Sequence, residues 1–259
     1  MFATQLEVMY RYVEDYTNNH DLNVAREIMH PDYQFTMSGK TLNREAYLEM
    51  VDDALSRFTD LRLIVDEFVV GEKRLAMAFR ETATSPRHGR SGVWRGVALY
   101  DFHSDGRLLA ANVEQDFWGR RAQFYGLTPS LKVGITDPVV WETCAGIENE
   151  ENRIALEKSL SQLDTKLVMF DEGEELVVSP EFIEVMEVIL AGSRFAARIR
   201  INGEYSSKNN SLGLSVLPAN PVEMVATGVG TLNASGGLDS ARFITDRFGL
   251  WSQYREIET

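Results

Sequence analysis

Hydrophobic positions recur at helical spacing near the start of the chain and then alternate with polar ones. They predict a helix over about residues 5–19 and a shorter helix over residues 21–29, which His30-Pro31 would end. The alternating residues 33–37 predict a strand, and residues 44–58 predict a third helix. The apolar positions of the first helix are Leu6, Met9, Tyr10, Val13 and Tyr16.

Longer strands are expected to follow, over residues 61–70, 75–84, 93–102 and 108–117. The segment 71–73, the longer stretch 85–92 and the turn at Asp105-Gly106 would join them. The predicted order is α-α-β-α-β-β-β-β, so the fold class is α+β.

A motif near the end of this pattern occurs a second time. Residues 116–123 and 246–253 both read Asp-x-x-Gly-x-x-x-Gln, and they lie 130 positions apart. That spacing is far longer than a solenoid repeat and has the size of a domain. At the same offset, residues 94–100 fall on 224–230 and 112–115 fall on 242–245. Residues 180–194 also have a helical pattern, as 44–58 do, so the chain is expected to contain a duplicated unit.

Length and composition agree with two domains. The 259 residues are 44% hydrophobic, which gives each half enough apolar surface for its own core. We expect domains at residues 1–129 and 137–259, joined by the Pro- and Gly-containing segment 128–137.

Charge and cysteine content exclude several classes of function. A net charge of −13 disfavours nucleic-acid binding, which needs a basic face. No apolar run approaches the roughly 18 residues of a membrane helix, and the N-terminus lacks the pattern of a secretory signal. The single cysteine, Cys144, can form neither an intrachain disulfide nor a zinc cluster. We therefore expect a cytoplasmic protein that binds neither membranes nor nucleic acids.

Three segments of the first half resemble the nuclear transport factor two-like superfamily, and within it the SnoaL-like polyketide cyclases. They are His30-Pro31-Asp32-Tyr33, Tyr100-Asp101-Phe102, and the motif from Asp116 to Gln123. The resemblance implies a cone, in which a strongly curved sheet wraps around helices and encloses an apolar pocket. Because such proteins often pair through their outer sheet faces, two copies in one chain are expected to form an intrachain pseudo-dimer. A homodimer of the whole chain remains possible.

The resemblance also implies a catalytic role for Asp116, since the aspartate at this position is the general acid/base of the cyclases. Strand alternation places Asn112, Glu114 and Asp116 on one face, which would be the pocket face if the family geometry holds. Two carboxylates in an apolar cavity cannot both ionise easily, so one would have a raised pKa. The alternative is that Asp116 caps or forms a salt bridge at the end of the strand and Glu114 points to water.

Other residues are candidates for binding the substrate, and each has a structural alternative. Arg80 and Arg95 could stabilise an enolate or instead pair at the surface with Glu81 or Asp101. His30 could move a proton or simply end a helix. Aromatic residues that could line the pocket, or belong to an ordinary core, include Tyr10, Tyr33, Trp94 and Trp118.

The second copy lacks parts of the proposed site. Ile244 replaces Glu114, Arg242 replaces Asn112, and all four histidines lie in the first copy. We therefore expect one active site, in the first half, with the second half as a scaffold or degenerate pocket.

No phosphate loop, Gly-x-Ser-x-Gly or His-Glu-x-x-His motif occurs, so we expect no metal and no cofactor. The predicted function is that of a lyase or isomerase/cyclase that moves protons on a hydrophobic, aromatic small molecule. One alternative is a non-catalytic binding module. Another is an epoxide-hydrolase-like enzyme, although Arg80-Glu81-Thr82 stands where such an enzyme should have Arg-x-Asp.

Overall fold

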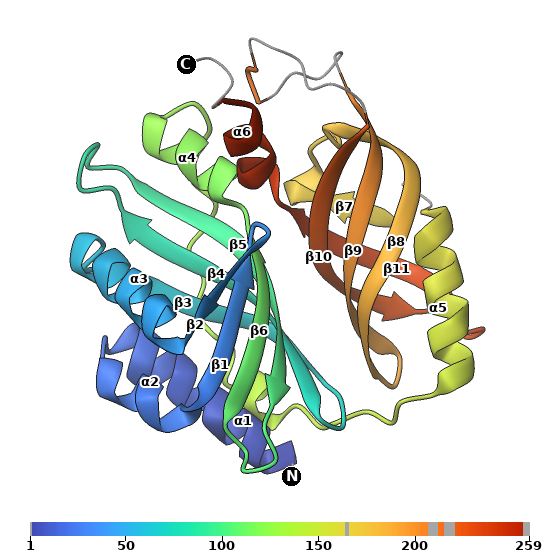
Figure 1. The fold of residues 1–259 in the computed structure, drawn as a ribbon, viewed down its shortest axis with the longest axis horizontal. Helices are drawn as coiled ribbons and strands as arrows, with labels where there is room; N and C mark the ends of the chain where they lie inside the picture. Colours follow the sequence, from blue (N-terminus) through green and yellow to red (C-terminus); the bar gives the residue numbers. More distant parts are fainter. Residues whose placement is uncertain (1, 164–165, 207–211, 215–220, 256–259) are drawn as a thin grey trace.

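The computed structural model describes residues 2–163, 166–206, 212–214 and 221–255 (Figure 1). The helices of the first half are α1 (Phe2–Tyr10), the π-helical η1 (Arg11–Asn18), α2 (Leu22–Ile28), α3 (Arg44–Arg57) and α4 (Phe117–Tyr125). Asp21 and Asn43 fix where α2 and α3 begin, because their side chains accept hydrogen bonds from the backbone N–H groups of Asn23 and Ala46. The predicted helices over 21–29 and 44–58 are confirmed.

The first sheet contains all four long strands that alternation predicted. Its strands are β1 (Met29–Met37), β2 (Lys40–Asn43), β3 (Arg62–Val70), β4 (Arg74–Thr84), β5 (Ser91–Phe102) and β6 (Leu108–Gln115). They lie in the order β2-β1-β6-β5-β4-β3, and only β1 and β6 run parallel. The short strand β2 and the helix α4 were not predicted.

The second half repeats this sheet with fewer helices. Its elements are η2 (Pro138–Glu142), α5 (Glu150–Gln162), β7 (Val168–Phe170), η3 (Asp171–Gly173), β8 (Val178–Ala191), β9 (Arg194–Tyr205), β10 (Val222–Leu232), β11 (Leu238–Thr245) and α6 (Arg247–Arg255). The order β7-β11-β10-β9-β8 matches β1-β6-β5-β4-β3, and β7 runs parallel to β11 as β1 does to β6. The two halves therefore share one topology, and the α+β class is confirmed.

The helical prediction for residues 180–194 is wrong, because this segment lies mostly in strand β8. β8 pairs with β9 along its whole length, and the pairing register shifts between Pro180 and Phe182 and again between Val185 and Glu187. Each bulge adds one residue and reverses the phase of the inward and outward positions. The sequence therefore does not show the period of two that identifies a strand.

The two sheets pack against each other through their outer faces (Figure 1). Alanines at positions 76, 78 and 196 keep this interface thin, and larger apolar residues fill it from both sides. The larger residues are Val69, Val97, Leu99, Ile189, Val229 and Ile244. This is the expected intrachain pseudo-dimer, and it leaves the concave faces of the two sheets pointing away from each other.

The concave faces differ in what covers them. In the second half, Leu156 and Leu160 of α5 pack with Phe195 and Phe243 in one apolar core. In the first half, η1, α2 and α3 cover the sheet, and the core beneath them contains several tyrosines. Within the described ranges, no helix combines the length and apolarity needed to span a bilayer.

Candidate active site

A cavity of about 360 Å³ lies between the concave face of the first sheet and the helices that cover it. Helix α3 forms one wall, strands β4, β5 and β6 form another, and the start of α4 borders it. Most of its lining is aromatic or aliphatic, including Phe35, Tyr47, Leu55, Phe58, Phe79, Val113 and Phe117. Its volume is in the range of small-molecule sites.

Glu81 brings a carboxylate to this apolar wall. Its Oε2 accepts a hydrogen bond of 3.0 Å from the indole Nε1 of Trp94, and its Oε1 lies 3.5 Å from the amide nitrogen of Gln115. Burial raises the pKa of Glu81 to about 7, and the charge of Arg120 and the two hydrogen bonds only partly offset this effect. The carboxyl group can therefore exchange a proton near neutral pH.

Arg120, on α4, brings a positive charge to the cavity. Its guanidinium carbon lies 4.3 Å from the ring centre of Phe117, 5.1 Å from that of Trp94 and 5.9 Å from that of Phe58. These are cation–π distances. Burial lowers the pKa of Arg120, although the group remains charged at neutral pH.

Tyrosine hydroxyls lie on the other side of the cavity. The hydroxyls of Tyr12 and Tyr47 form a hydrogen bond of 2.8 Å, and the ring of Tyr100 packs edge-on against Tyr12. Burial raises the pKa of all three phenols, so they stay protonated and can donate to a developing negative charge.

The predicted pocket face of β6 is wrong. Asn112, Glu114 and Asp116 do share a side of the chain, but that side packs against the second sheet. Asn112 donates to Glu187 at 2.8 Å, and Glu114 is buried 3.9 Å from Arg198. The cavity is lined instead by the alternate positions Val113, Gln115 and Phe117.

Asp116 itself begins helix α4, as the structural alternative proposed. Its Oδ1 accepts a hydrogen bond of 2.8 Å from the backbone N–H of Gly119 and one of 2.6 Å from Arg247 of the second half. Asp246 caps Gly249 in the same way, also at 2.8 Å. A Cβ on Gly119 would lie 2.1 Å from the capping carboxylate, which explains the glycine. The repeated motif is therefore a helix-capping motif.

The two predicted arginines also lie outside the cavity. Arg80 and Arg95 share the carboxylate of Asp66, at 2.6 and 3.0 Å, and Arg95 contacts Glu172 of the second half. Both therefore pair with carboxylates, as the alternative held, but with Asp66 and Glu172 and not with the expected Glu81 or Asp101.

The predicted aromatic residues are dispersed. Trp94 is buried beside Glu81 and Arg120. Tyr33 is buried in the core against Tyr47. The remaining two lie elsewhere: Tyr10 is 48% exposed and packs on Trp141, and Trp118 packs on Trp251. Only Trp94 among them contacts the charged groups of the cavity.

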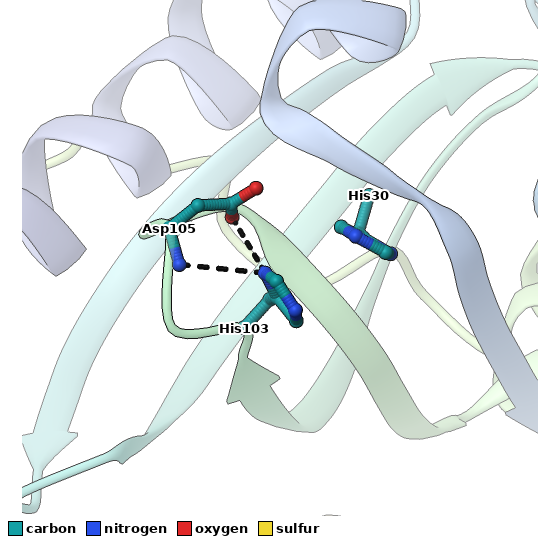
Figure 2. A group of neighbouring side chains, drawn as sticks. All are labelled: His30, His103 and Asp105. Atoms are coloured by element: carbon teal, nitrogen blue, oxygen red, sulfur yellow. Dashed lines mark hydrogen bonds and ion pairs between the residues drawn. The ribbon is translucent and has the colours of Figure 1, made fainter.

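His30 lies near the start of β1, where it neighbours His103 and Asp105 (Figure 2). The imidazoles of His30 and His103 stack with their centres 4.1 Å apart, and Asp105 is held by Arg107 at 2.7 Å. The three side chains each offer one possible metal-ligand atom, and these atoms lie within 4.8 Å of one another. His30 does not line the cavity, and its predicted role there is wrong.

Glu81, Gln115 and Arg120 were not among the predicted site residues. A signal for Glu81 exists, because Leu75, Met77 and Phe79 occupy alternate positions of β4 and are all buried in the core. The next position on that inward face is Glu81. A carboxylate that interrupts an apolar stripe of a strand is expected to point into the protein.

Comparisons with known proteins agree with this description of the first half. Residues 9–111, which include Tyr12, Tyr47, Glu81 and Tyr100, match the model of the SnoaL-like domain. These residues form a SnoaL-like domain. No curated protein matches the sequence.

Solved structures similar to the chain each match about half of it. AclR, a proposed hydroxylase from Streptomyces galilaeus, is 19% identical with a TM-score of 0.45, covering 51% of this chain and 87% of its own. A proposed SnoaL-like polyketide cyclase from Jannaschia sp. CCS1 is 17% identical with a TM-score of 0.44, covering 48% and 92%. IdmH, a proposed polyketide cyclase from Streptomyces antibioticus, is 19% identical with a TM-score of 0.43, covering 47% and 98%.

Proposed function

We propose that the SnoaL-like domain is a cofactor-independent acid/base enzyme of the lyase or isomerase type, acting on a hydrophobic, aromatic small molecule. The observation that carries this proposal is a carboxylate, Glu81, half-buried in the wall of an apolar cavity and with a pKa of about 7. A general base works best when its pKa lies near the working pH. Glu81 thus replaces Asp116 as the base.

In the proposed reaction, Glu81 removes a proton from a carbon next to a substrate carbonyl. The electron pair moves onto the carbonyl oxygen, where the enolate accepts a hydrogen bond from whichever hydroxyl of the Tyr12–Tyr47 pair does not donate to the other. The enolate then collapses in one of two ways. Either the electron pair returns to form a double bond to the next carbon, from which a leaving group departs with the electrons of its own bond, or the proton on Glu81 returns at another carbon. The first outcome is a lyase reaction and the second an isomerisation.

For the second half we propose a scaffold role. Its α5 and its sheet enclose an apolar core, and its Arg247 reaches across to the cap of α4, the helix that carries Arg120. Residues 137–259 would therefore support the wall of a cavity that residues 1–129 form.

A non-catalytic binding module is the competing function, because Trp94 and Gln115 already occupy both oxygens of Glu81. Proton exchange distinguishes the two. A panel of aromatic ketones and enones should be incubated with the protein in deuterium oxide and followed by proton NMR. An enzyme with this base will exchange the acidic C–H of at least one compound faster than buffer does. A binding module will broaden the signals without exchange.

The pH dependence of the reaction gives a further prediction. Glu81 accepts a proton only when ionised, so kcat/KM should rise about tenfold per pH unit below pH 7 and level off above it. The measurement is kcat/KM from pH 5 to pH 9 with any compound that turns over. A rate that is flat between pH 5 and pH 8 would contradict the assignment of Glu81 as the base.

A further inference from the structure

The cavity holds one positively charged group that the proposed proton transfer does not need. Within the described part of the chain, no side chain accepts a hydrogen bond from the Arg120 guanidinium, whose contacts are the ring faces of Phe58, Trp94 and Phe117. Other arginines with partly or fully buried side chains are paired differently. Arg80 and Arg247, for example, lie within 2.6 Å of a carboxylate oxygen.

The charge of Arg120 is not balanced within the cavity at neutral pH. Glu81 is the nearest opposite charge, and the indole of Trp94 joins the two, since its N–H donates to Glu81 and its ring lies under Arg120. Because Glu81 has a pKa of about 7, it is ionised only about half of the time at that pH. Arg57, which also lines the cavity, adds positive charge and lowers the pKa of Arg120 further.

Guanidinium groups are planar donors that match the two oxygens of a carboxylate. Three aromatic rings surround the Arg120 guanidinium without accepting a conventional hydrogen bond, so its N–H groups can serve a ligand in the cavity that Arg120 lines. The rest of the lining consists largely of aromatic and aliphatic side chains, which favour a flat apolar ring system.

We propose that Arg120 is an anion-binding residue and that the cavity takes aromatic carboxylates, the acid group lying on Arg120 and the ring system against the apolar walls. This inference names the substrate class of the proposed enzyme and rests on the same cavity. It requires binding only, and its test is independent of turnover.

Binding of such an anion should be coupled to a proton. The groups that face Glu81 are Trp94 from β5, Gln115 from β6 and Arg120 from α4, with Arg57 of α3 and the neutral tyrosines farther along the cavity. A ligand carboxylate engages Arg120 and adds a negative charge, so it favours the protonated form of Glu81. Binding at pH 7 should therefore take up about half a proton, and affinity should fall up to tenfold per pH unit above pH 7.

The test uses naphthoate and its neutral counterpart naphthamide, measured by titration calorimetry on the full chain. The wild-type protein should bind naphthoate at least about tenfold more tightly than naphthamide at pH 6, the equivalent of one charge-assisted hydrogen bond. Arg120→Met should bind both probes equally, and Arg120→Lys should keep part of the preference. Repeating the wild-type titration at pH 7 in buffers of different ionisation enthalpy measures the proton uptake.

Arg121→Met is the matched control, because Arg121 is the next residue of the same helix but packs on Trp251, at 4.6 Å. It should leave the preference unchanged. Naphthamide binding shows that Arg120→Met is folded. Equal binding of the two probes by the wild-type protein, or an undiminished preference in Arg120→Met, would overturn the inference. The two proposals can fail separately. If the protein exchanges no proton of any compound but still prefers naphthoate, and Arg120→Met loses that preference, the proposed enzyme is refuted and the anion site is supported.

Discussion

Replacing Glu81 with glutamine is expected to lower kcat by about 10²–10⁴-fold, the usual contribution of a general base. Glutamine keeps the size of the side chain and an oxygen that can accept from Trp94, but it cannot take a proton. The measurement is kcat with the compound that turns over, together with proton exchange by NMR. Asp116→Asn is the comparison, since Asp116 does not line the cavity, and folded protein of that variant should keep most of the rate.

The same glutamine variant is expected to be more stable than the wild-type protein above pH 7. The folded-state pKa of Glu81 is raised from 4.5 to about 7, so the folded state holds this proton over a range in which the unfolded chain has lost it. Stability from this group is complete below pH 4.5 and is lost as the pH rises through 7. The shift corresponds to roughly 3 kcal/mol, and Glu81→Gln does not lose it. Urea unfolding at pH 5 and pH 8 should therefore show a gain only at pH 8, and a loss at both values would mean that the variant is misfolded.

Replacing Arg247 with methionine is expected to reduce the free energy of unfolding by about 3–5 kcal/mol. Arg247 is 2% exposed and binds Asp116 at 2.6 Å, Asp171 at 3.4 Å and Glu174. Methionine fills a similar volume but leaves Asp116 and Asp171 buried without their cation. Such carboxylates pick up protons, so lower pH should restore part of the lost stability.

The measurement for this second variant is urea unfolding between pH 5 and pH 8. Arg107→Met is the control, because Arg107 forms an exposed pair with Asp105 and its loss should change stability by less than about 1 kcal/mol. If Arg247→Met behaved like Arg107→Met, the stabilising role of the Arg247 ion pairs would be refuted.

Sequence periodicity predicted the elements whose pattern is set by one buried face. Strands β3 to β6 and helix α3 have such a pattern, and they lie where it places them. The period of two did not identify strand β8, because two bulges shift the phase of its inward and outward positions. Helix α4 was missed, although the cap at Asp116 and Gly119 is itself a start signal for a helix.

The site was harder to predict, because alternation shows which residues share a face but not which face is concave. Asn112, Glu114 and Asp116 share a side of the chain along β6, and the family resemblance suggested that this side faces the pocket. In the fold, these polar side chains lie at the contact between the two halves, where Glu114 faces Arg198 and Asp116 pairs with Arg247. Glu81 could have been found from the apolar stripe that it interrupts on β4.

Because both sheets belong to one polypeptide, dilution and mutation affect their pairing differently from the pairing of two separate subunits. Partners that meet only by collision separate at low concentration, whereas tethered partners face each other at an effective concentration set by the linker. A substitution in a homodimer alters both copies at once, but here it alters one. One half could therefore have fewer covering helices while the other kept a cavity with a carboxylate and a guanidinium.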